Sequence, residues 1–239
     1  MIIYGRNAVR EALRGRRSHD VSSIWATAAT AHEPWLEGAQ VRVSAAEEIE
    51  RRCGSSAHQG VAADAGGYHY VGANELLALE DPLIVVLDQV QDPQNLGSIC
   101  RTAECAGATG LIIPERRSAE VTPAVCKASA GAVEHLRIAR VRNVADFLLD
   151  ARAAGCWSYG ACAPTSSTVP YTAPDYRGGV VLVLGSEGSG LRPRVAEACD
   201  QLVSLPLRGR IESLGVAAAA SALLYGTLHG RDESLDKAP

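Results

Sequence analysis

From Leu83 onwards, apolar residues follow two alternating patterns along the chain. Short continuous apolar runs are typical of strands that are buried on both faces of a parallel sheet. Stretches with apolar residues at helical spacing separate these runs, and Gly107 and Gly155 end two of those stretches. The sequence therefore predicts an α/β domain with a largely parallel sheet. The expected strands cover 83–87, 111–113, 136–141, 157–161, 180–184 and 201–205, and the expected helices cover 96–106, 123–130, 144–154, 194–199 and 214–228.

The first 72 residues have a different pattern and predict a small mixed α/β domain. Apolar residues at helical spacing begin at Ala8, and Asn7 is the expected N-cap of that helix. A short strand over 41–43 precedes an expected helix over 45–52. We therefore expect an N-terminal domain over 1–72 and a C-terminal domain over 83–232. Between them we expect a linker over 73–82 that contains a short helix over 74–79, and after them a disordered tail over 233–239.

Composition and charge narrow the class of protein only slightly. A net charge of −4 argues against a general nucleic-acid binder, although net charge averages local basic patches away. The seven cysteines form no C-x-x-C pair, so we expect reduced thiols and no metal site. No signal peptide is evident, and the longest apolar run, 216–225, is short of the roughly 20 residues that a bilayer needs. We expect a cytoplasmic protein without membrane association.

Three loops follow predicted strand ends, where open α/β sheets bind ligands. In the first loop, 88–97, Asp92-Pro93 forces a turn and Asn95 is the expected cap of the next helix. The second loop, 185–191, has three glycines in the order G-x-x-G-x-G, which matches neither the dinucleotide fingerprint nor a Walker motif. In the third loop, 205–214, Ser213 is the expected cap of the last helix. From these residues alone, a plain structural turn is favoured for the first loop, disfavoured for the second and equally consistent with the third.

Together the three loops resemble the three motifs of the SpoU (TrmH-like) family of RNA 2′-O-ribose methyltransferases. A further stretch between the first two motifs is also similar to the family. Two stretches in the first 72 residues resemble the N-terminal RNA-binding domain that accompanies the subfamily methylating a guanosine of 23S rRNA. The motifs are Asp92–Ala103, Leu184–Leu191 and Leu205–Leu214, and the further stretches are Lys127–Ala132, Tyr4–Val9 and His58–Ala62.

This resemblance implies a C-terminal SPOUT α/β domain with a deep trefoil knot, preceded by a small α/β RNA-binding domain. It also implies S-adenosyl-L-methionine (SAM) as cofactor, RNA as substrate and a homodimer. The expected catalytic residues are Arg101, Asn95, Glu187 and Ser213. The expected cofactor-binding residues are Gly185, Leu205, Leu214, Leu184, Ser186 and Gly188, and the expected RNA-binding residues are Arg6, Arg10, Arg208 and Arg210.

Arg101 matches the arginine that the family uses when the ribose 2′-hydroxyl attacks the SAM methyl group. An arginine is fully protonated in proteins and cannot be a simple base, so we expect it to orient groups or stabilise charge. Asn95, Glu187 and Ser213 match positions that shape the site.

The third motif departs from the family pattern. Gly215 and Ala217 stand where the family usually has asparagine and serine. The main hypothesis is an active methyltransferase, and the alternative is a catalytically impaired, RNA-binding or ribosome-associated relative. A nucleotide-binding oxidoreductase is disfavoured because the dinucleotide fingerprint is absent.

Overall fold

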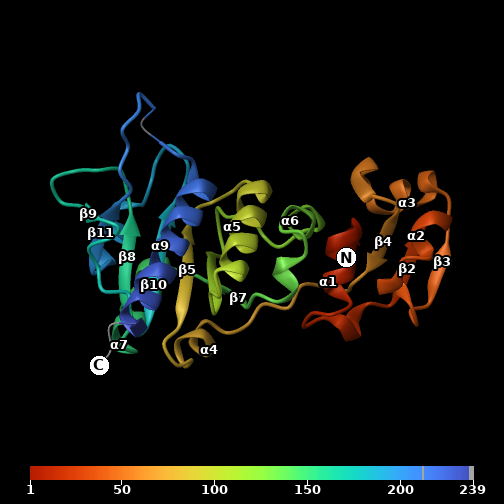
Figure 1. The fold of residues 1–239 in the computed structure, drawn as a ribbon, viewed down its shortest axis with the longest axis horizontal. Coiled ribbons are helices and arrows are strands. Elements are labelled where there is room, and N and C mark those ends of the chain that lie inside the picture. The colour runs from red at the N-terminus through yellow and green to blue at the C-terminus, as the bar shows by residue number, and fades with distance from the viewer. Residues whose placement is uncertain (212, 237–239) are drawn as a thin grey trace. The chain divides into compact units, whose positions relative to one another are not determined.

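A computed structural model describes residues 1–211 and 213–236, the last five by their backbone alone (Figure 1). Packing divides the chain into two units. Unit 1 contains residues 1–69 and 120–135, and unit 2 contains residues 70–119 and 136 onwards. The expected domain boundaries stay a prediction, and the division by packing differs from them in grouping 120–135 with residues 1–69.

Unit 1 is built on a four-stranded sheet in the order β1-β4-β2-β3. Strand β4 is antiparallel to both of its neighbours, whereas β2 and β3 are parallel. The mixed α/β prediction is confirmed, although only β3 was expected among the strands, because strands of three or four residues carry too little alternation to be detected. The elements are β1 (Ile2–Tyr4), α1 (Arg6–Ala12), β2 (Ser23–Ala26), α2 (Ala28–Ala31), β3 (Val41–Val43), α3 (Ala46–Cys53), β4 (Val61–Asp64) and α6 (Pro123–Ala128), with 3₁₀ turns at Ser18–Asp20, Pro34–Leu36, Ser56–His58 and Ala132–Glu134.

A buried ion pair holds the segment 120–135 within unit 1. The Arg17 guanidinium donates to both carboxylate oxygens of Glu134, at 3.0 and 2.6 Å, and both side chains are almost fully buried. Gly15 allows this approach, because a Cβ there would lie 2.6 Å from Glu134 Cβ. The segment is therefore fixed by side-chain chemistry that its own sequence pattern does not reveal.

Unit 2 contains a seven-stranded sheet in the order β7-β6-β5-β10-β8-β11-β9, and every neighbouring pair is parallel. The strand order changes direction between β5 and β10, which is the kind of switch point where parallel sheets bind ligands. The elements are α4 (Ala73–Leu77), β5 (Leu83–Asp88), α5 (Pro93–Cys105), β6 (Gly110–Pro114), β7 (Ile138–Val141), α7 (Val144–Ala153), β8 (Trp157–Ala161), β9 (Val169–Pro170), β10 (Val180–Gly185), α8 (Pro193–Ala198), β11 (Gln201–Ser204) and α9 (Val216–Asp236).

The core of unit 2 explains its continuous apolar runs. Alternate residues of the central strands, including Ile84, Val86 and Val183, pack against side chains of α4, α7 and α8. Helices α5 and α9 pack side by side on the sheet, with α9 against β10 (Figure 1). Strands that are covered on both faces have no polar face, so they read as unbroken apolar runs.

The observed elements correct several expected boundaries. Helix α9 begins at Val216 rather than at 214 and continues to Asp236, so the expected tail does not start at 233. No proline or glycine interrupts the chain between Arg231 and Asp236, and residues 237–239 lie outside the described part. Within the described residues, no helix has both the length and the apolar character needed to cross a bilayer. The trefoil knot stays a prediction.

Candidate active site

The loop that follows β10 is held in a tight turn. Ser186 N donates to Gly190 O at 3.2 Å, and Gly190 N donates to Ser186 O at 3.0 Å. A Cβ at Gly185 would lie 2.1 Å from the Gly190 carbonyl carbon and 2.4 Å from Leu191 N, both of which are backbone atoms. Position 185 therefore requires glycine, as expected where backbone segments approach closely.

The loop that follows β5 leads into α5, and its cap differs from the expected one. Asp92 is the N-cap, since its Oδ1 accepts a hydrogen bond from Gln94 N at 3.0 Å. The prediction that Asn95 caps the helix is wrong, because Pro93 already starts the helix and Asn95 lies in its first turn. The Asn95 side chain instead donates from Nδ2 to Glu187 Oε1 at 3.1 Å. Two of the expected catalytic residues are therefore in direct contact.

The third loop connects β11 to α9. Ser213 does not cap the helix as expected, because α9 begins three residues later, at Val216. Its Oγ accepts a hydrogen bond from Gly215 N at 3.3 Å instead. Gly215 has a φ of +74°, and a Cβ there would lie 3.4 Å from Glu187 Oε1. The residue that departs from the family pattern thus lies directly beside Glu187.

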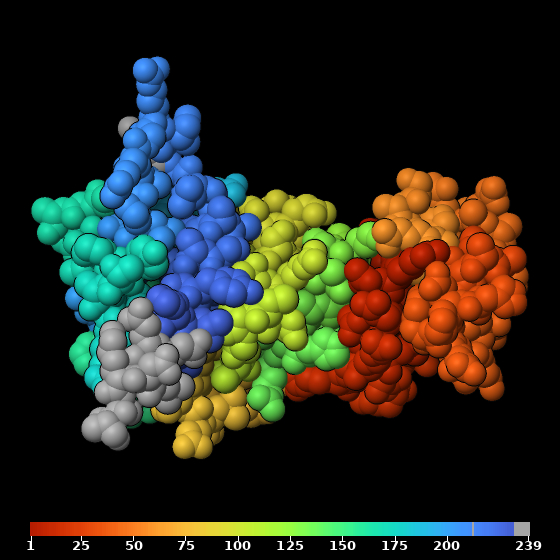
Figure 2. Space-filling model, viewed as in Figure 1, coloured from red at the N-terminus to blue at the C-terminus, as the bar shows by residue number. Residues whose placement is uncertain are grey.

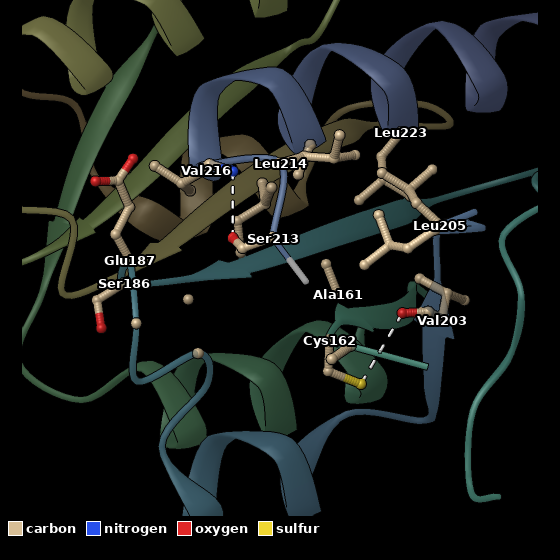
Figure 3. Close-up of a pocket in the computed structure, with 18 of the residues that line it drawn as sticks. Ala161, Cys162, Ser186, Glu187, Val203, Leu205, Ser213, Leu214, Val216 and Leu223 are labelled. Carbon is tan, nitrogen blue, oxygen red and sulfur yellow. Dashed lines mark hydrogen bonds between the residues drawn. The ribbon is translucent and has the colours of Figure 1, made fainter. Parts of the chain in front are cut away.

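A cavity of about 250 Å³ brings the second and third loops together (Figure 3). In Figure 3, Ser186 and Glu187 lie at one side of the cavity, and Leu205 and Leu223 lie at the other. Eight of the expected residues border it: Leu184, Gly185, Ser186, Glu187, Gly188, Leu205, Ser213 and Leu214. All six expected cofactor-binding residues are therefore at one cavity, with two of the four expected catalytic residues.

Other lining residues were missed by sequence reasoning. The largest missed segment is 161–164, which consists of the last residue of β8 and the three residues after it. A signal was available, because β8 is a parallel strand, and its carboxyl end must lie at the same edge of the sheet as those of β10 and β11. The lining residues that were not among the expected site residues are Ala161, Cys162, Ala163, Pro164, Gly190, Val203, Leu207, Gly215, Val216, Ala219 and Leu223.

The chemistry of the lining is largely apolar and contains no basic side chain among the described residues. Burial raises the pKa of the Cys162 thiol, so this side chain contributes a neutral surface at physiological pH. Glu187 is the lining residue with a formal charge. Such a site suits an uncharged or cationic ligand and disfavours a phosphate. No cluster of metal-binding side chains occurs in the described part of the chain.

Arg101 is not at this cavity. It is exposed on α5, and its side chain makes no hydrogen bond or ion pair with any residue that the structure describes. It follows Asn95 by six residues, which turns its side chain by about 240° around the helix axis. The structure therefore brings Asn95, Glu187 and Ser213 together and leaves Arg101 on another side of α5.

The four arginines expected to contact RNA differ in whether they form ion pairs within the chain. Arg6 pairs with Glu33 at 3.0 Å, and Arg10 pairs with Glu11 at 2.8 Å, both within unit 1. Arg208 and Arg210 are exposed on the loop between β11 and α9, which projects from the surface of unit 2 (Figure 2). The loop arginines are thus more available to a ligand than the two in unit 1.

The sequence matches two protein families over nearly its whole length. Residues 82–225 match the SpoU rRNA Methylase family, and this match covers more than half of the chain. The chain belongs to the SpoU rRNA methylase family. Residues 2–71 match the family named RNA 2′-O ribose methyltransferase substrate binding. The family expected from the motifs is therefore confirmed.

Individual relatives support the same family. The 23S rRNA (guanosine-2′-O-)-methyltransferase RlmB of Xanthomonas campestris pv. campestris is 39% identical over 200 residues, 82% of this chain and 80% of that protein. An uncharacterized tRNA/rRNA methyltransferase of Synechocystis sp. is 34% identical over 238 residues, and the match covers 94% of this chain but 61% of that relative.

A solved structure supports the fold of this SpoU family member. The crystal structure of an AdoMet-bound rRNA methyltransferase from Sinorhizobium meliloti has a TM-score of 0.79 and 27% identity, and the match covers 95% of this chain and 86% of that one. This likeness confirms the expected class, an α/β SPOUT domain preceded by a small α/β domain.

Proposed function

We propose that this protein transfers a methyl group from SAM to a ribose 2′-hydroxyl of RNA, with a guanosine of 23S rRNA as its target. The observation that carries the proposal is the shared cavity, where the second and third motif loops meet and Asn95 of the first motif contacts Glu187. The name of the Xanthomonas relative supports the choice of nucleotide.

The cavity fits SAM by its chemistry. Its apolar walls suit an adenine ring and a methionine chain, and the glycine backbone of 185–190 exposes main-chain groups to a ligand. SAM carries no phosphate, which agrees with a lining that lacks basic side chains, and its positive sulfonium is compatible with Glu187. We propose that Leu184, Gly185, Ser186, Gly188, Leu205 and Leu214 hold the cofactor.

When bound, SAM supplies an electrophilic methyl group. The 2′-hydroxyl is a weak nucleophile and must lose its proton as the new O–C bond forms, so the residues around it must position it and stabilise charge. Glu187, fixed by Asn95, presents carboxylate oxygens that can accept a hydrogen bond from a ribose hydroxyl. Ser213 adds a hydroxyl at the same cavity.

We propose that the protein acts as a homodimer in the cytoplasm. Arg101 lies outside the cavity of its own chain, and we propose that a second copy presents it to the RNA. Unit 1 and the exposed arginines of the loop 205–211 are the proposed RNA contacts, since basic side chains bind phosphate.

The test is methyl transfer from labelled SAM to 23S rRNA, followed by mapping of ribose methylation in cells with and without the protein. SAM binding is measured separately by calorimetry. Transfer to one guanosine, lost in the deletion strain, is the expected result. A folded protein that binds SAM but methylates no RNA would favour the impaired relative instead.

A further inference from the structure

Asp88 and Arg192 form an ion pair beneath the loop that follows β10. Asp88 is the last residue of β5, and Arg192 immediately precedes α8. Asp88 Oδ1 accepts from Arg192 Nε at 2.8 Å and from the terminal nitrogen Nη2 at 2.6 Å. Asp88 Oδ2 accepts from the Arg192 main-chain N–H at 3.0 Å. One carboxylate therefore holds both the side chain and the backbone of Arg192.

This pair closes the loop at both of its ends. Asp88 lies opposite Gly185 in the register of β5 and β10, so its backbone is beside the residue at which the loop begins. Its side chain holds Arg192, the residue at which the loop ends. Between these points, the hydrogen bonds between Ser186 and Gly190 close the turn itself. The ion pair is thus the long-range side-chain contact that joins the two ends of the loop, whereas Asn95 holds Glu187 within it.

The location of the pair makes it strong and specific. The Asp88 side chain is fully buried, whereas that of Arg192 is 43% exposed. Hydrogen bonds between charged groups are stronger than neutral ones, and a buried carboxylate that loses its partner is costly. The cavity is lined by the loop residues that this pair encloses, but by neither Asp88 nor Arg192. The action of the pair on a ligand is therefore indirect and runs through the shape of the loop.

We propose that Asp88 and Arg192 are positioning residues for the cofactor, which hold the loop 185–191 in its binding conformation before SAM arrives. The inference rests on the proposed function, because it takes SAM as the occupant of the cavity. A preorganised loop avoids the cost of ordering on binding. Losing the pair should therefore weaken SAM binding and leave the chemical step largely unchanged.

Unit 2 offers a matched control, the ion pair of Arg152 with Asp200. Arg152 Nε donates to Asp200 Oδ1 at 2.6 Å, and the Arg152 side chain is 48% exposed. Asp200 Oδ2 accepts from Ser158 N at 2.8 Å, near the start of β8. This pair lies at the amino ends of the strands, whereas the cavity lies at their carboxyl ends. It resembles the first pair in chemistry and exposure, but touches no cofactor loop.

The experiment compares Arg192→Gln with Arg152→Gln in the full-length protein. Calorimetry gives the Kd for SAM, thermal unfolding gives Tm, and initial rates on 23S rRNA give kcat and the KM for SAM. We expect Arg192→Gln to raise Kd and KM for SAM about tenfold, the scale of one lost charge-assisted hydrogen-bonded pair, with kcat nearly unchanged. We expect Arg152→Gln to lower Tm and leave Kd unchanged.

A second variant covers the case in which Arg192→Gln does not fold. Asp88→Asn combined with Arg192→Gln removes both charges, so that no unpaired charge stays buried, and should again raise the Kd for SAM. Unchanged SAM affinity in a folded Arg192 or double variant would overturn the inference. An equal loss of affinity in Arg152→Gln would also overturn it, because the effect would then follow from stability alone. If the unsubstituted protein does not bind SAM, the proposed function itself fails.

Discussion

Replacing Gly215 by asparagine tests whether the candidate active site lacks a group that its chemistry needs. Gly215 stands where the SpoU resemblance leads us to expect asparagine, and its φ of +74° lies in the left-handed region. A Cβ there would lie 3.4 Å from Glu187 Oε1, which is the short end of the normal range of van der Waals contacts. An amide at this position would therefore be within reach of the carboxylate that Asn95 already contacts.

The magnitudes follow from this geometry. Asparagine adopts the left-handed conformation more readily than other non-glycine residues, so Gly215→Asn should fold with a small change in Tm. An added hydrogen bond to Glu187 contributes a net ~0.5–1.5 kcal/mol, which limits the change in kcat/KM to about 2–10-fold. Gly215→Ala is the matched control, because it adds the Cβ without the amide. Its left-handed strain costs about 1–2 kcal/mol and should lower Tm by about 2–8 °C.

The assay is initial-rate methyl transfer to 23S rRNA by the unsubstituted protein and both variants, with SAM binding and Tm measured on the same preparations. We expect the unsubstituted protein to be active, since Asn95 already provides an amide to Glu187. The reasoning is refuted if the unsubstituted protein is inactive and Gly215→Asn restores transfer by a hundredfold or more. In that case the glycine, rather than another feature, would be the cause of lost catalysis.

Three further predictions concern other parts of the chain. Gly185→Ala should abolish SAM binding, because the new Cβ would overlap the backbone of Gly190. Gly209→Ala, where the new Cβ meets open space, should bind SAM normally, and equal binding by both variants would contradict the close approach of the backbone at positions 185 and 190. Arg101→Ala should abolish methyl transfer and leave SAM affinity intact, and unchanged turnover of this variant would exclude the role of Arg101. If two chains share a site, mixing the Arg101→Ala protein with a Glu187→Ala protein should restore part of the activity. Glu134→Ala should lower the free energy of unfolding of unit 1 by about 3–5 kcal/mol, because it leaves Arg17 buried without its partner. Chemical denaturation monitored by fluorescence measures this free energy, and a small decrease would mean that the pair is dispensable.

The sequence by itself determined the fold class and most of the site. Continuous apolar runs such as 180–184 identify buried parallel strands, because the pattern depends on residues adjacent in the chain. The carboxyl ends of these strands predict where a ligand binds, and all six expected cofactor residues border the cavity. The expected caps were less successful, since Asp92 rather than Asn95 caps α5.

The tertiary structure alone decided which distant side chains meet. Asn95 contacts Glu187 across 92 positions, Asp88 holds Arg192 across 104, and Glu134 joins Arg17 across 117. Strand order and register determine which side chains meet in these pairs. The periodicity of apolar residues encodes neither of them, because it indicates only which face of an element is buried. The same reason explains why the packing of 120–135 in unit 1 could not be predicted from local pattern, since it depends on which element becomes a neighbour after the chain has folded.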